Sequence, residues 1–385
     1  MKVAVLRETG AGERRVALVP ALVSELVDRH SLTVAVEAGC GASSQYSDEE
    51  YAAAGAQIGD RASTLADATV VLRVAPPDPV DLESLPRGTV VIGFLAPFDH
   101  PAGVRALAAG GLTSFAMELV PRTTRAQRMD ALSSQANLAG YKAVLLGADT
   151  LGRILPMFMT AAGTIRPGKV LVLGAGVAGL QAIATARRLG ARVEAFDVRP
   201  AVKEQVESLG ASFLVAEEEV AAEGEGGYAG ALSEEQHQRE LDLIAAHIHD
   251  ADIVVTTARI PGRRAPELIT PDMLASMRAG SVVIDMAASE EGGNCCASRP
   301  DETVVVEGVT VLGPTNLPSS LAHHASQMYA RNIATLLLEM VDEGELSLDF
   351  DNDILGPACL THDGVVRHGP TRERLDASAE ETTDG

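Results

Sequence analysis

The stretch KVLVLGAGVAGLQAIATARRLGARVEAFD, residues 169–197, decides the fold of the chain. It opens with an apolar run that predicts a buried parallel strand, and Gly174, Gly176 and Gly179 then follow in a G-x-G-x-x-G frame. In such a frame the first glycine permits a tight turn, the second lets a pyrophosphate approach the backbone, and the third lets a helix pack closely on the sheet. The free N–H groups at the start of that helix favour an anion.

The acidic residue that completes the pattern is Asp197, which ends a second predicted strand at Arg192–Phe196. It stands at the distance from the glycines at which a carboxylate meets a ribose 2′-hydroxyl. A carboxylate there repels the 2′-phosphate of NADP(H), so the stretch predicts a preference for NAD(H). The alternative is a glycine-rich turn without a ligand, but the strand, the helix and the acid are all where the fingerprint requires them.

Composition indicates two α/β domains in the 385 residues. Hydrophobic residues make up 46% and aromatic residues only 3%, so the cores consist of Val, Leu, Ile and Ala, as suits parallel sheets buried on both faces. The net charge of −22 argues against nucleic acid and anionic membrane surfaces as partners. No apolar run approaches the roughly 20 residues of a membrane span, so we expect no direct membrane insertion.

The cysteines and the first residues of the chain indicate a cytoplasmic protein. Cys40, Cys295, Cys296 and Cys359 show no C-x-x-C spacing and no disulfide framework, which is typical of reduced thiols. The opening MKVAVLRE predicts a strand rather than a signal peptide.

Strand and helix signals alternate through residues 1–135 without a glycine fingerprint, which predicts a first domain that closes over a cofactor. Helices are predicted at 20–30, 101–109, 136–151 and 322–341, and Ser47–Glu50 reads as a capping box. The expected fold class is α/β, with two doubly wound Rossmann-like domains with parallel sheets joined by long helices. The expected domains are 1–135 plus 325–375, and 136–324, followed by a disordered acidic tail at 376–385.

Further loops are expected on the cofactor side of the second sheet, because Thr256–Ala258 follow a strand at the carboxyl edge, where ligands bind at a switch point. The residues predicted to contact NAD(H) are Gly174, Gly176, Val177, Ala178, Gly179, Asp197, Val198, Arg199, Thr257, Ala258 and Asn294. The pair His323–His324 lacks companion ligands at metal-site spacing, so we expect a helix start there and no metal.

With these pieces placed, the chain resembles the NAD(H)-binding component (domain I) of the proton-translocating NAD(P) transhydrogenases, within the alanine dehydrogenase/transhydrogenase superfamily. The resemblance covers roughly residues 1–370. It rests on RETGAGERRVALVP, PRTTRAQRMDALSSQANLAGYKA, TAAGTIRPG before the fingerprint, FDVRPAVKEQVESLGA, TTARIPGRRAPELIT, GSVVIDMAASEEGGNC and LGPTNLPSS. The segment PRTTRAQRMDALSSQ, residues 121–135, is the most specific, since alanine dehydrogenases share the fold and the fingerprint but not this segment.

The resemblance implies that Arg122, Gln127, Asp130 and Ser133 hold the nicotinamide ring. Asp130 and Ser133 would bond the carboxamide and set the exposed ring face, Arg122 would reach a phosphate or the carboxamide oxygen, and Gln127 would order one ring against the other. From the pattern alone, a solvated helix start with ordinary charges is the alternative. Tyr228, in the acidic, glycine-rich segment 217–236, matches the family's mobile-loop tyrosine that closes over the nucleotide; the alternative is a stray tyrosine.

The resemblance further implies hydride transfer between NADH on this chain and NADP⁺ on an NADP(H)-binding beta subunit. Positioning is then the catalysis, because two nicotinamides exchange a hydride without a general acid or base. Proton translocation would belong to membrane subunits, including a small alpha-2 subunit. The chain would be a homodimer, held through its partners on the cytoplasmic face of the inner membrane.

A free-standing NAD-dependent alanine dehydrogenase is the main rival interpretation. That reaction passes through an imine and needs a proton-transferring His or Lys. Here Arg73 lies near the expected lysine, and Gly93–Ala96 supplies no histidine. Arginine is a poor proton donor, which counts against this rival. An NAD-sensing regulator without catalysis is the second rival.

Overall fold

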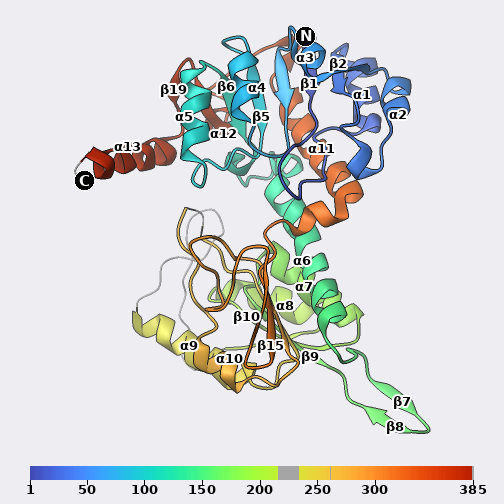
Figure 1. Cartoon of the computed structure of the whole chain (residues 1–385), viewed down its shortest axis with the longest axis vertical. Helices are drawn as coiled ribbons and strands as arrows, with labels where there is room; N and C mark the ends of the chain where they lie inside the picture. The colour runs from blue at the N-terminus through green and yellow to red at the C-terminus, as the bar shows by residue number, and fades with distance from the viewer. Residues whose placement is uncertain (216–233, 261, 384–385) are drawn as a thin grey trace. The chain divides into compact units, whose positions relative to one another are not determined.

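The computed structural model describes residues 1–215, 234–260 and 262–383. Two compact units divide the chain (Figure 1): unit 1 comprises Met1–Gln135 and the chain from Ser319 onward, and unit 2 comprises Ala136–Pro318. Each unit has one large, mostly parallel sheet, so the predicted α/β class with two Rossmann-like domains is confirmed.

Unit 1 has an eight-stranded sheet in the order β19-β18-β6-β5-β4-β1-β2-β3. The neighbours from β6 to β3 pair in parallel, and β18 and β19 extend the sheet by antiparallel pairing. The strands are β1 (Lys2–Val5), β2 (Thr33–Glu37), β3 (Gln57–Gly59), β4 (Val70–Leu72), β5 (Val90–Gly93), β6 (Thr113–Ala116), β18 (Cys359–His362) and β19 (Val365–Val366).

Both faces of the unit 1 sheet are buried, because successive strand residues point to opposite sides. Val3 and Val5 belong to a core that includes Val23 of helix α1 and Ile333 of helix α11, whereas Ala4 belongs to a second core on the other face. The helices are α1 (Pro20–His30), α2 (Asp48–Ala53), α3 (Arg61–Leu65), α4 (Pro79–Ser84), α5 (Pro101–Ala109), α11 (Ala322–Leu338), α12 (Leu355–Ala358) and α13 (Gly369–Thr383).

Unit 2 has a seven-stranded sheet in the order β11-β10-β9-β12-β13-β15-β14, parallel except for its last strand. The chain leaves the central strand β9 toward β10 on one side and returns to β12 on the other, which creates a switch point at the carboxyl ends. The strands are β9 (Lys169–Leu173), β10 (Arg192–Phe196), β11 (Ser212–Phe213), β12 (Ile253–Thr256), β13 (Val282–Asp285), β14 (Thr303–Val306) and β15 (Val309–Leu312).

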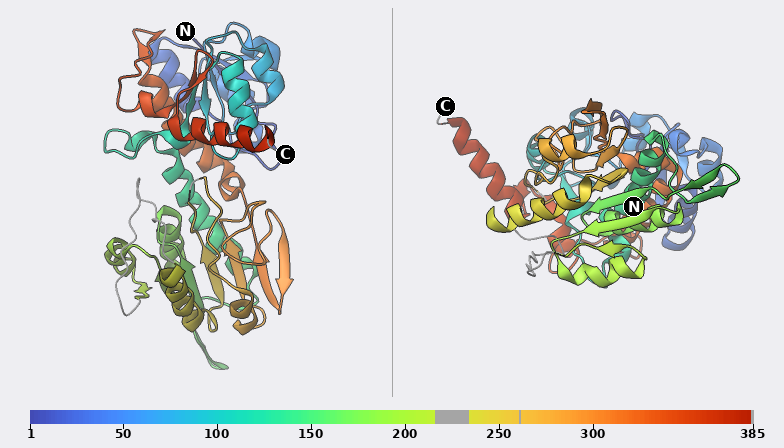
Figure 2. Two further views of the ribbon diagram at one scale, coloured as in Figure 1. Left: turned by 90° about the vertical axis from the view of Figure 1, so that its left-hand side faces the viewer. Right: turned by 90° about the horizontal axis from the view of Figure 1, so that it is seen from below.

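Helices also cover both faces of the unit 2 sheet (Figure 2). Val170 and Val172 pack with one set of helices, and Leu171 and Leu173 pack with the other. The first set is α6 (Ala131–Thr150), α7 (Val177–Arg188) and α8 (Lys203–Ser208), and the second is α9 (Glu234–Ile248) and α10 (Pro271–Ser276). Within the described ranges, none of the helices combines the length and apolarity that a membrane span requires.

Several elements have the predicted bounds, namely α1, α5 and β10. The capping box is also present, since the Ser47 side chain accepts the Glu50 N–H and the Glu50 carboxylate accepts the Ser47 N–H. Helix α6 starts five residues before the predicted position, because Asp130 and Ser133 bond to each other at its N-terminus.

Two stretches differ more strongly from expectation. Helix α13 continues to Thr383, over residues for which the sequence predicts a disordered tail, and Leu375 just before them is buried in the unit 1 core. An unpredicted hairpin of β7 (Phe158–Thr160) and β8 (Gly163–Ile165) extends from the rest of unit 2 (Figures 1 and 2). A short hairpin of β16 (Val341–Asp342) and β17 (Glu345–Leu346) follows helix α11 in unit 1.

Candidate functional site

The turn between β9 and α7 shows why its first and third positions are glycines. Gly174 has φ +98°, and a Cβ there would lie 2.5 Å from the Thr257 hydroxyl oxygen. A Cβ on Gly179 would lie 1.8 Å from the Gly174 carbonyl oxygen, so only glycine lets helix α7 come this close to the turn. Both glycines are therefore required by backbone geometry.

Gly176 has a different environment, because a Cβ built on it meets only the Arg199 guanidinium, at 3.9 Å. Gly176 is the N-cap residue of helix α7, and Val177 and Ala178 begin its first turn. The N–H groups of such a first turn have no partner within the helix and carry its positive dipole end. Open space above these N–H groups suits a pyrophosphate, so the turn fits a dinucleotide.

Asp197 connects the glycine turn to the end of strand β10. Its carboxylate accepts the Ala175 N–H at 2.7 Å, and the Arg199 guanidinium donates to both of its oxygens at 3.0 Å. The Arg199 backbone N–H also donates to it at 2.9 Å, across Val198. Sequence reasoning placed Asp197 and Arg199 at the cofactor but did not find this ion pair, which the D-x-R spacing could have suggested.

The loops after β12 and β13 flank the glycine turn. The Thr257 hydroxyl donates to the Gly174 carbonyl at 3.0 Å. Asn294 is fully buried, and its amide accepts the Ala258 N–H at 3.0 Å and donates to the Ala258 and Pro266 carbonyls at 2.9 and 2.8 Å. The amide of Asn294 therefore holds the loop that contains Ala258.

A buried acid that sequence reasoning missed organises the same region. Asp285 ends β13, and its carboxylate accepts the Thr256 hydroxyl at 2.8 Å, the Ser298 hydroxyl at 2.6 Å and the Cys295 N–H at 2.9 Å. An acid at a strand end among many small polar residues was the available signal. Asp285 fixes the fold of the loop that carries Asn294.

In unit 1, the segment before helix α6 is anchored by apolar residues and exposes polar ones. Ala126 and Met129 are buried in the core, whereas Arg122 and Gln127 are exposed. Asp130 accepts the Ser133 N–H at 2.8 Å and the Ser133 hydroxyl at 2.6 Å.

Helix α11 supports this segment from within unit 1. Asn332 donates to the Arg128 carbonyl at 2.8 Å and accepts the Ser134 hydroxyl at 2.7 Å. Arg125 forms ion pairs with Glu339 and Asp353, so its side chain is directed along the surface. These bonds hold the backbone of the segment in one conformation. Arg122 and Gln127 are exposed on it, a few residues before the bonded pair Asp130–Ser133.

Two further predictions concern the loop tyrosine and the histidine pair. Tyr228 lies outside the described residues. The His323 Nδ1–H donates to the Ser44 carbonyl at 3.0 Å, and the ring stacks on Tyr46 with 4.8 Å between ring centroids, near the start of helix α11. Among residues 1–215, 234–260 and 262–383, no group of three His, Cys, Asp or Glu side chains is arranged to hold a metal ion.

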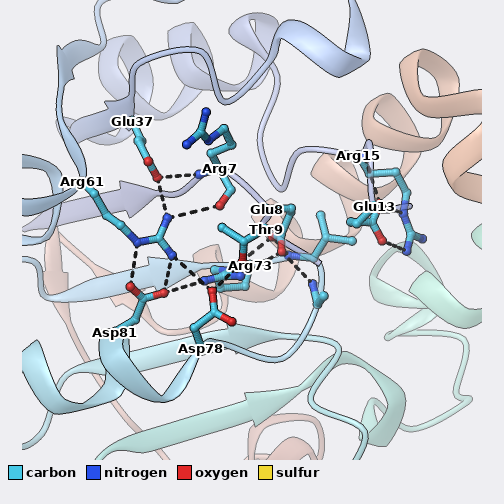
Figure 3. Close-up of polar contacts among 12 residues, drawn as sticks. Arg7, Glu8, Thr9, Glu13, Arg15, Glu37, Arg61, Arg73, Asp78 and Asp81 are labelled. Atoms are coloured by element: carbon cyan, nitrogen blue, oxygen red, sulfur yellow. Dashed lines mark hydrogen bonds and ion pairs between the residues drawn. The ribbon is translucent and has the colours of Figure 1, made fainter. Parts of the chain in front are cut away.

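Arg73 follows strand β4 and lies in a network of buried ion pairs (Figure 3). Its guanidinium is 3.0 Å from the Glu8 carboxylate and 3.0 Å from that of Asp81, with the side chain 1% exposed. Arg61 pairs with Asp81 and lies 2.8 Å from Glu37. Burial raises the pKa of Glu8, opposed by its contact with Arg73. The Arg73 guanidinium is thus held by ion pairs with carboxylates inside unit 1.

Glu118 of unit 1 has a buried carboxylate that, like Asp285, was not predicted from the sequence. One of its carboxylate oxygens accepts the Ala96 N–H at 2.7 Å, and the other is buried without a hydrogen-bond partner among the described residues. Burial raises the pKa of Glu118 to about 7, opposed by backbone N–H groups that include Leu95 and Ala96.

Comparison with family models assigns both portions of the chain. Residues 4–139 match the model "Alanine dehydrogenase/PNT, N-terminal domain", and residues 143–369 match "Alanine dehydrogenase/PNT, C-terminal domain". The predicted resemblance to this superfamily is therefore confirmed.

Individual relatives agree with these matches. The chain is 44% identical over 380 residues to an NAD(P) transhydrogenase subunit alpha polypeptide of Rhodospirillum rubrum, covering 96% of this chain and 98% of that protein. It is 30% identical over 376 residues to alanine dehydrogenase of Mycobacterium tuberculosis, covering 95% and 94%. The crystal structure of a transhydrogenase from Sinorhizobium meliloti matches with a TM-score of 0.85 and 45% identity, covering 95% of this chain and 100% of that one.

Proposed function

Since the chain belongs to the alanine dehydrogenase/PNT family, we propose that it is the NAD(H)-binding subunit of a proton-translocating, Re/Si-specific NAD(P)⁺ transhydrogenase. The observation that carries the proposal is the 44% identity, over nearly the whole length of both chains, to a transhydrogenase alpha subunit. The match to an alanine dehydrogenase is more distant, at 30%.

Unit 2 binds NAD(H) at the carboxyl edge of its sheet. The open space at Gly176 and the first turn of α7, with Val177 and Ala178, receive the pyrophosphate. Asp197 receives the adenosine ribose, with Arg199 and Val198 beside it, and the loop of Thr257 and Ala258 borders the site. Asn294 supports binding by fixing Ala258, and Tyr228 closes over the bound nucleotide.

Arg122, Gln127, Asp130 and Ser133 hold and orient the nicotinamide. The bonded pair Asp130–Ser133 offers the carboxamide one acceptor and one hydroxyl in a fixed geometry, which selects the exposed ring face. The side chains of Arg122 and Gln127 are exposed. When bound, the nicotinamide supplies or accepts the hydride, and the chain contributes positioning and the exclusion of water rather than proton transfer.

The partners are an NADP(H)-binding beta subunit, which carries the second nicotinamide, and a small membrane alpha-2 subunit. Through them the chain is held at the cytoplasmic face of the inner membrane. The chain's own residues take no part in proton translocation.

The chain acts as a homodimer, and the hairpin β7–β8 is the best candidate contact. Met157, Phe158, Met159 and Ile165 are 57%, 48%, 75% and 54% exposed, a concentration of large apolar side chains that isolated soluble proteins seldom expose. Helix α11 buries ten residues within unit 1 and has less surface to offer.

The buried ion network argues against the alanine dehydrogenase alternative. Arg73 lies near the position expected for a lysine, and its guanidinium is bound to Glu8 and Asp81. A buried arginine that is so paired neither releases a proton nor turns toward a substrate.

The proposal is tested by hydride transfer from NADH to an NADP⁺ analogue that absorbs at a separate wavelength. The purified chain is assayed with and without the NADP(H)-binding subunit from the same genome, and alanine plus NAD⁺ is assayed in parallel. We expect transfer only with the partner and a loss of about 10- to 100-fold in Gln127→Ala, because a misplaced ring loses its reactive geometry. Arg128→Ala, an exposed neighbour, is the control. Alanine-dependent NAD⁺ reduction by the chain alone would overturn the proposal.

A further inference from the structure

A hollow of unit 2 lies at the opposite end of the sheet from the glycine turn. Lys169 and Arg192 are the first residues of β9 and β10, and Asp252 immediately precedes β12. Because these strands are parallel, their first residues lie at the amino edge, whereas Gly174 lies at the carboxyl edge. The cavity there measures about 800 Å³, which is within the range of small-molecule sites.

The lining of this cavity is unusually basic for an acidic chain. Among the described residues that line the cavity, the acidic ones are Asp250 and Asp252, and the basic ones are Arg153, Arg166, Lys169, Arg192 and Arg278. Glu194 adds one more carboxylate, which lies 2.9 Å from Lys169 and 3.4 Å from Arg192. Positive groups therefore outnumber negative ones locally, although the chain has a net charge of −22.

One buried carboxylate arranges two of the guanidinium groups. Asp252 lies 2.9 Å from Arg153 and 3.2 Å from Arg278, and it also accepts the Lys169 backbone N–H at 2.8 Å. The side chains of Arg153 and Arg278 are still 44% and 49% exposed. Arg153 also donates to the Ala279 carbonyl at 3.1 Å and Arg278 to the Asp250 carbonyl. Each guanidinium has five N–H donors in a rigid plane, so donors remain beyond these contacts.

Two other arginines are available to a ligand. Arg192 is 63% exposed, and Arg166 is exposed and makes no ion pair within residues 1–215, 234–260 and 262–383. The remaining wall includes the aliphatic side chains of Leu151 and Ile154. The cavity thus combines cationic groups from several chain segments with an apolar surface.

We propose that this cavity binds a small polyanion with two or more phosphate groups on an organic body, such as a nucleoside diphosphate or triphosphate. Planar guanidinium groups bind phosphate oxygens in pairs, and several such groups around one cavity favour a ligand with several anionic groups over a single carboxylate. The aliphatic wall covers the organic body. The site is separate from the dinucleotide turn, because the two occupy opposite ends of the same strands.

The test measures binding of tripolyphosphate and of ADP by calorimetry at low and high salt, with citrate as the polycarboxylate comparison. We expect tripolyphosphate to bind more tightly than citrate, and we expect its binding to weaken as the salt concentration rises. Arg166→Glu and Arg192→Glu should each weaken tripolyphosphate binding about tenfold or more, since each removes a charge-assisted contact. Both side chains are exposed, and unchanged circular dichroism verifies the fold of the variants.

Two controls separate binding in this cavity from a general charge effect and from binding at the dinucleotide turn. Arg29→Glu makes the same change in net charge at an arginine that is 73% exposed in unit 1, and it should bind tripolyphosphate like the parent. Gly176→Ala obstructs the dinucleotide turn and should also leave tripolyphosphate binding unchanged. Parent-like binding in Arg166→Glu and Arg192→Glu, equal binding of citrate, or loss of binding in Gly176→Ala would each overturn the proposal.

Discussion

At the scale of single residues, the proposed nicotinamide contacts also have a structural task. Asp130 bonds both the N–H and the hydroxyl of Ser133, so it caps helix α6 while it presents a carboxylate. A substitution at Asp130 therefore has two separable consequences, one for the stability of the helix and one for the orientation of the ring.

Asp130→Ala should lower the free energy of unfolding by about 1 kcal/mol through loss of the cap. It should also lower partner-dependent hydride transfer about 10-fold or more, through loss of ring orientation. Asp130→Asn is the matched control, because asparagine caps helices about as well as aspartate. Urea unfolding should show recovered stability in Asp130→Asn, and the assay should show how much of the transfer needs the charge. Full transfer in Asp130→Ala would contradict the assigned role.

Glu118 gives a prediction for the pH dependence of stability. Its pKa is raised by burial to about 7 in the folded chain, from an ordinary value of 4.5. The folded state therefore holds a proton that the unfolded state releases between these values, so this group's stabilising contribution is complete below pH 4.5 and is lost as pH rises to 7. At about 1.4 kcal/mol per pKa unit, the contribution is about 3 kcal/mol.

Glu118→Gln tests this assignment by urea unfolding at several pH values. The amide keeps an acceptor for the Ala96 N–H and carries no ionisable proton. The difference in stability between variant and parent should therefore shift in favour of the variant as pH rises from 5 to 8. A difference that does not change with pH would show that Glu118 is not the titrating group.

The sequence permitted the residues of the glycine turn to be predicted individually, because each glycine has a distinct steric reason. It did not reveal that Arg199 occupies both oxygens of Asp197 or that the Asn294 amide is used by backbone groups. Those bonds depend on loops that are distant in sequence and meet only in the folded unit. Asp285 and Glu118 were missed for the same reason.

At the scale of elements, the junction of β9 and α7 provides a matched pair of variants. In Gly179→Ala the added Cβ would lie 1.8 Å from the Gly174 carbonyl, so the helix must move away and stability should fall by about 3 kcal/mol. In Gly176→Ala the nearest atom is 3.9 Å away, so the fold should be retained and NADH binding weakened instead. Thermal unfolding and NADH titration separate the two effects. Normal NADH affinity in Gly176→Ala would contradict pyrophosphate binding at this turn.

Element boundaries were predictable where a local signal sets them. Helices α1 and α5 each have a proline in the first turn, and α2 begins with a capping box. Each of these signals lies within a few residues of the helix start, and the observed starts agree with the predicted ones. The hairpin β7–β8 was missed because its strands have three residues each, too few for a periodic pattern. Helix α13 was missed because its charged composition is also typical of disorder, whereas the burial of Leu375 depends on the rest of unit 1.

At the scale of the whole molecule, the exposed hairpin connects the structure with the proposed homodimer. Met159→Asp places a charge at a side chain that is 75% exposed. It should leave the fold unchanged and shift sedimentation toward the monomer, because a charge buried at an interface without a partner is costly. Val305→Asp, at a side chain that is 66% exposed on β14, is the control. A dimer that persists in Met159→Asp would place the contact elsewhere.

Direct hydride transfer between two nicotinamides is the central claim, and isotope transfer tests it most directly. NADH that carries deuterium on one face of C4 is incubated with the chain, its NADP(H)-binding partner and NADP⁺ in ordinary water, and the NADPH formed is analysed by mass spectrometry. We predict that deuterium from one labelled face, and not from the other, appears in NADPH without dilution by solvent hydrogen. Solvent hydrogen in NADPH, or transfer from both faces, would contradict direct transfer between positioned rings.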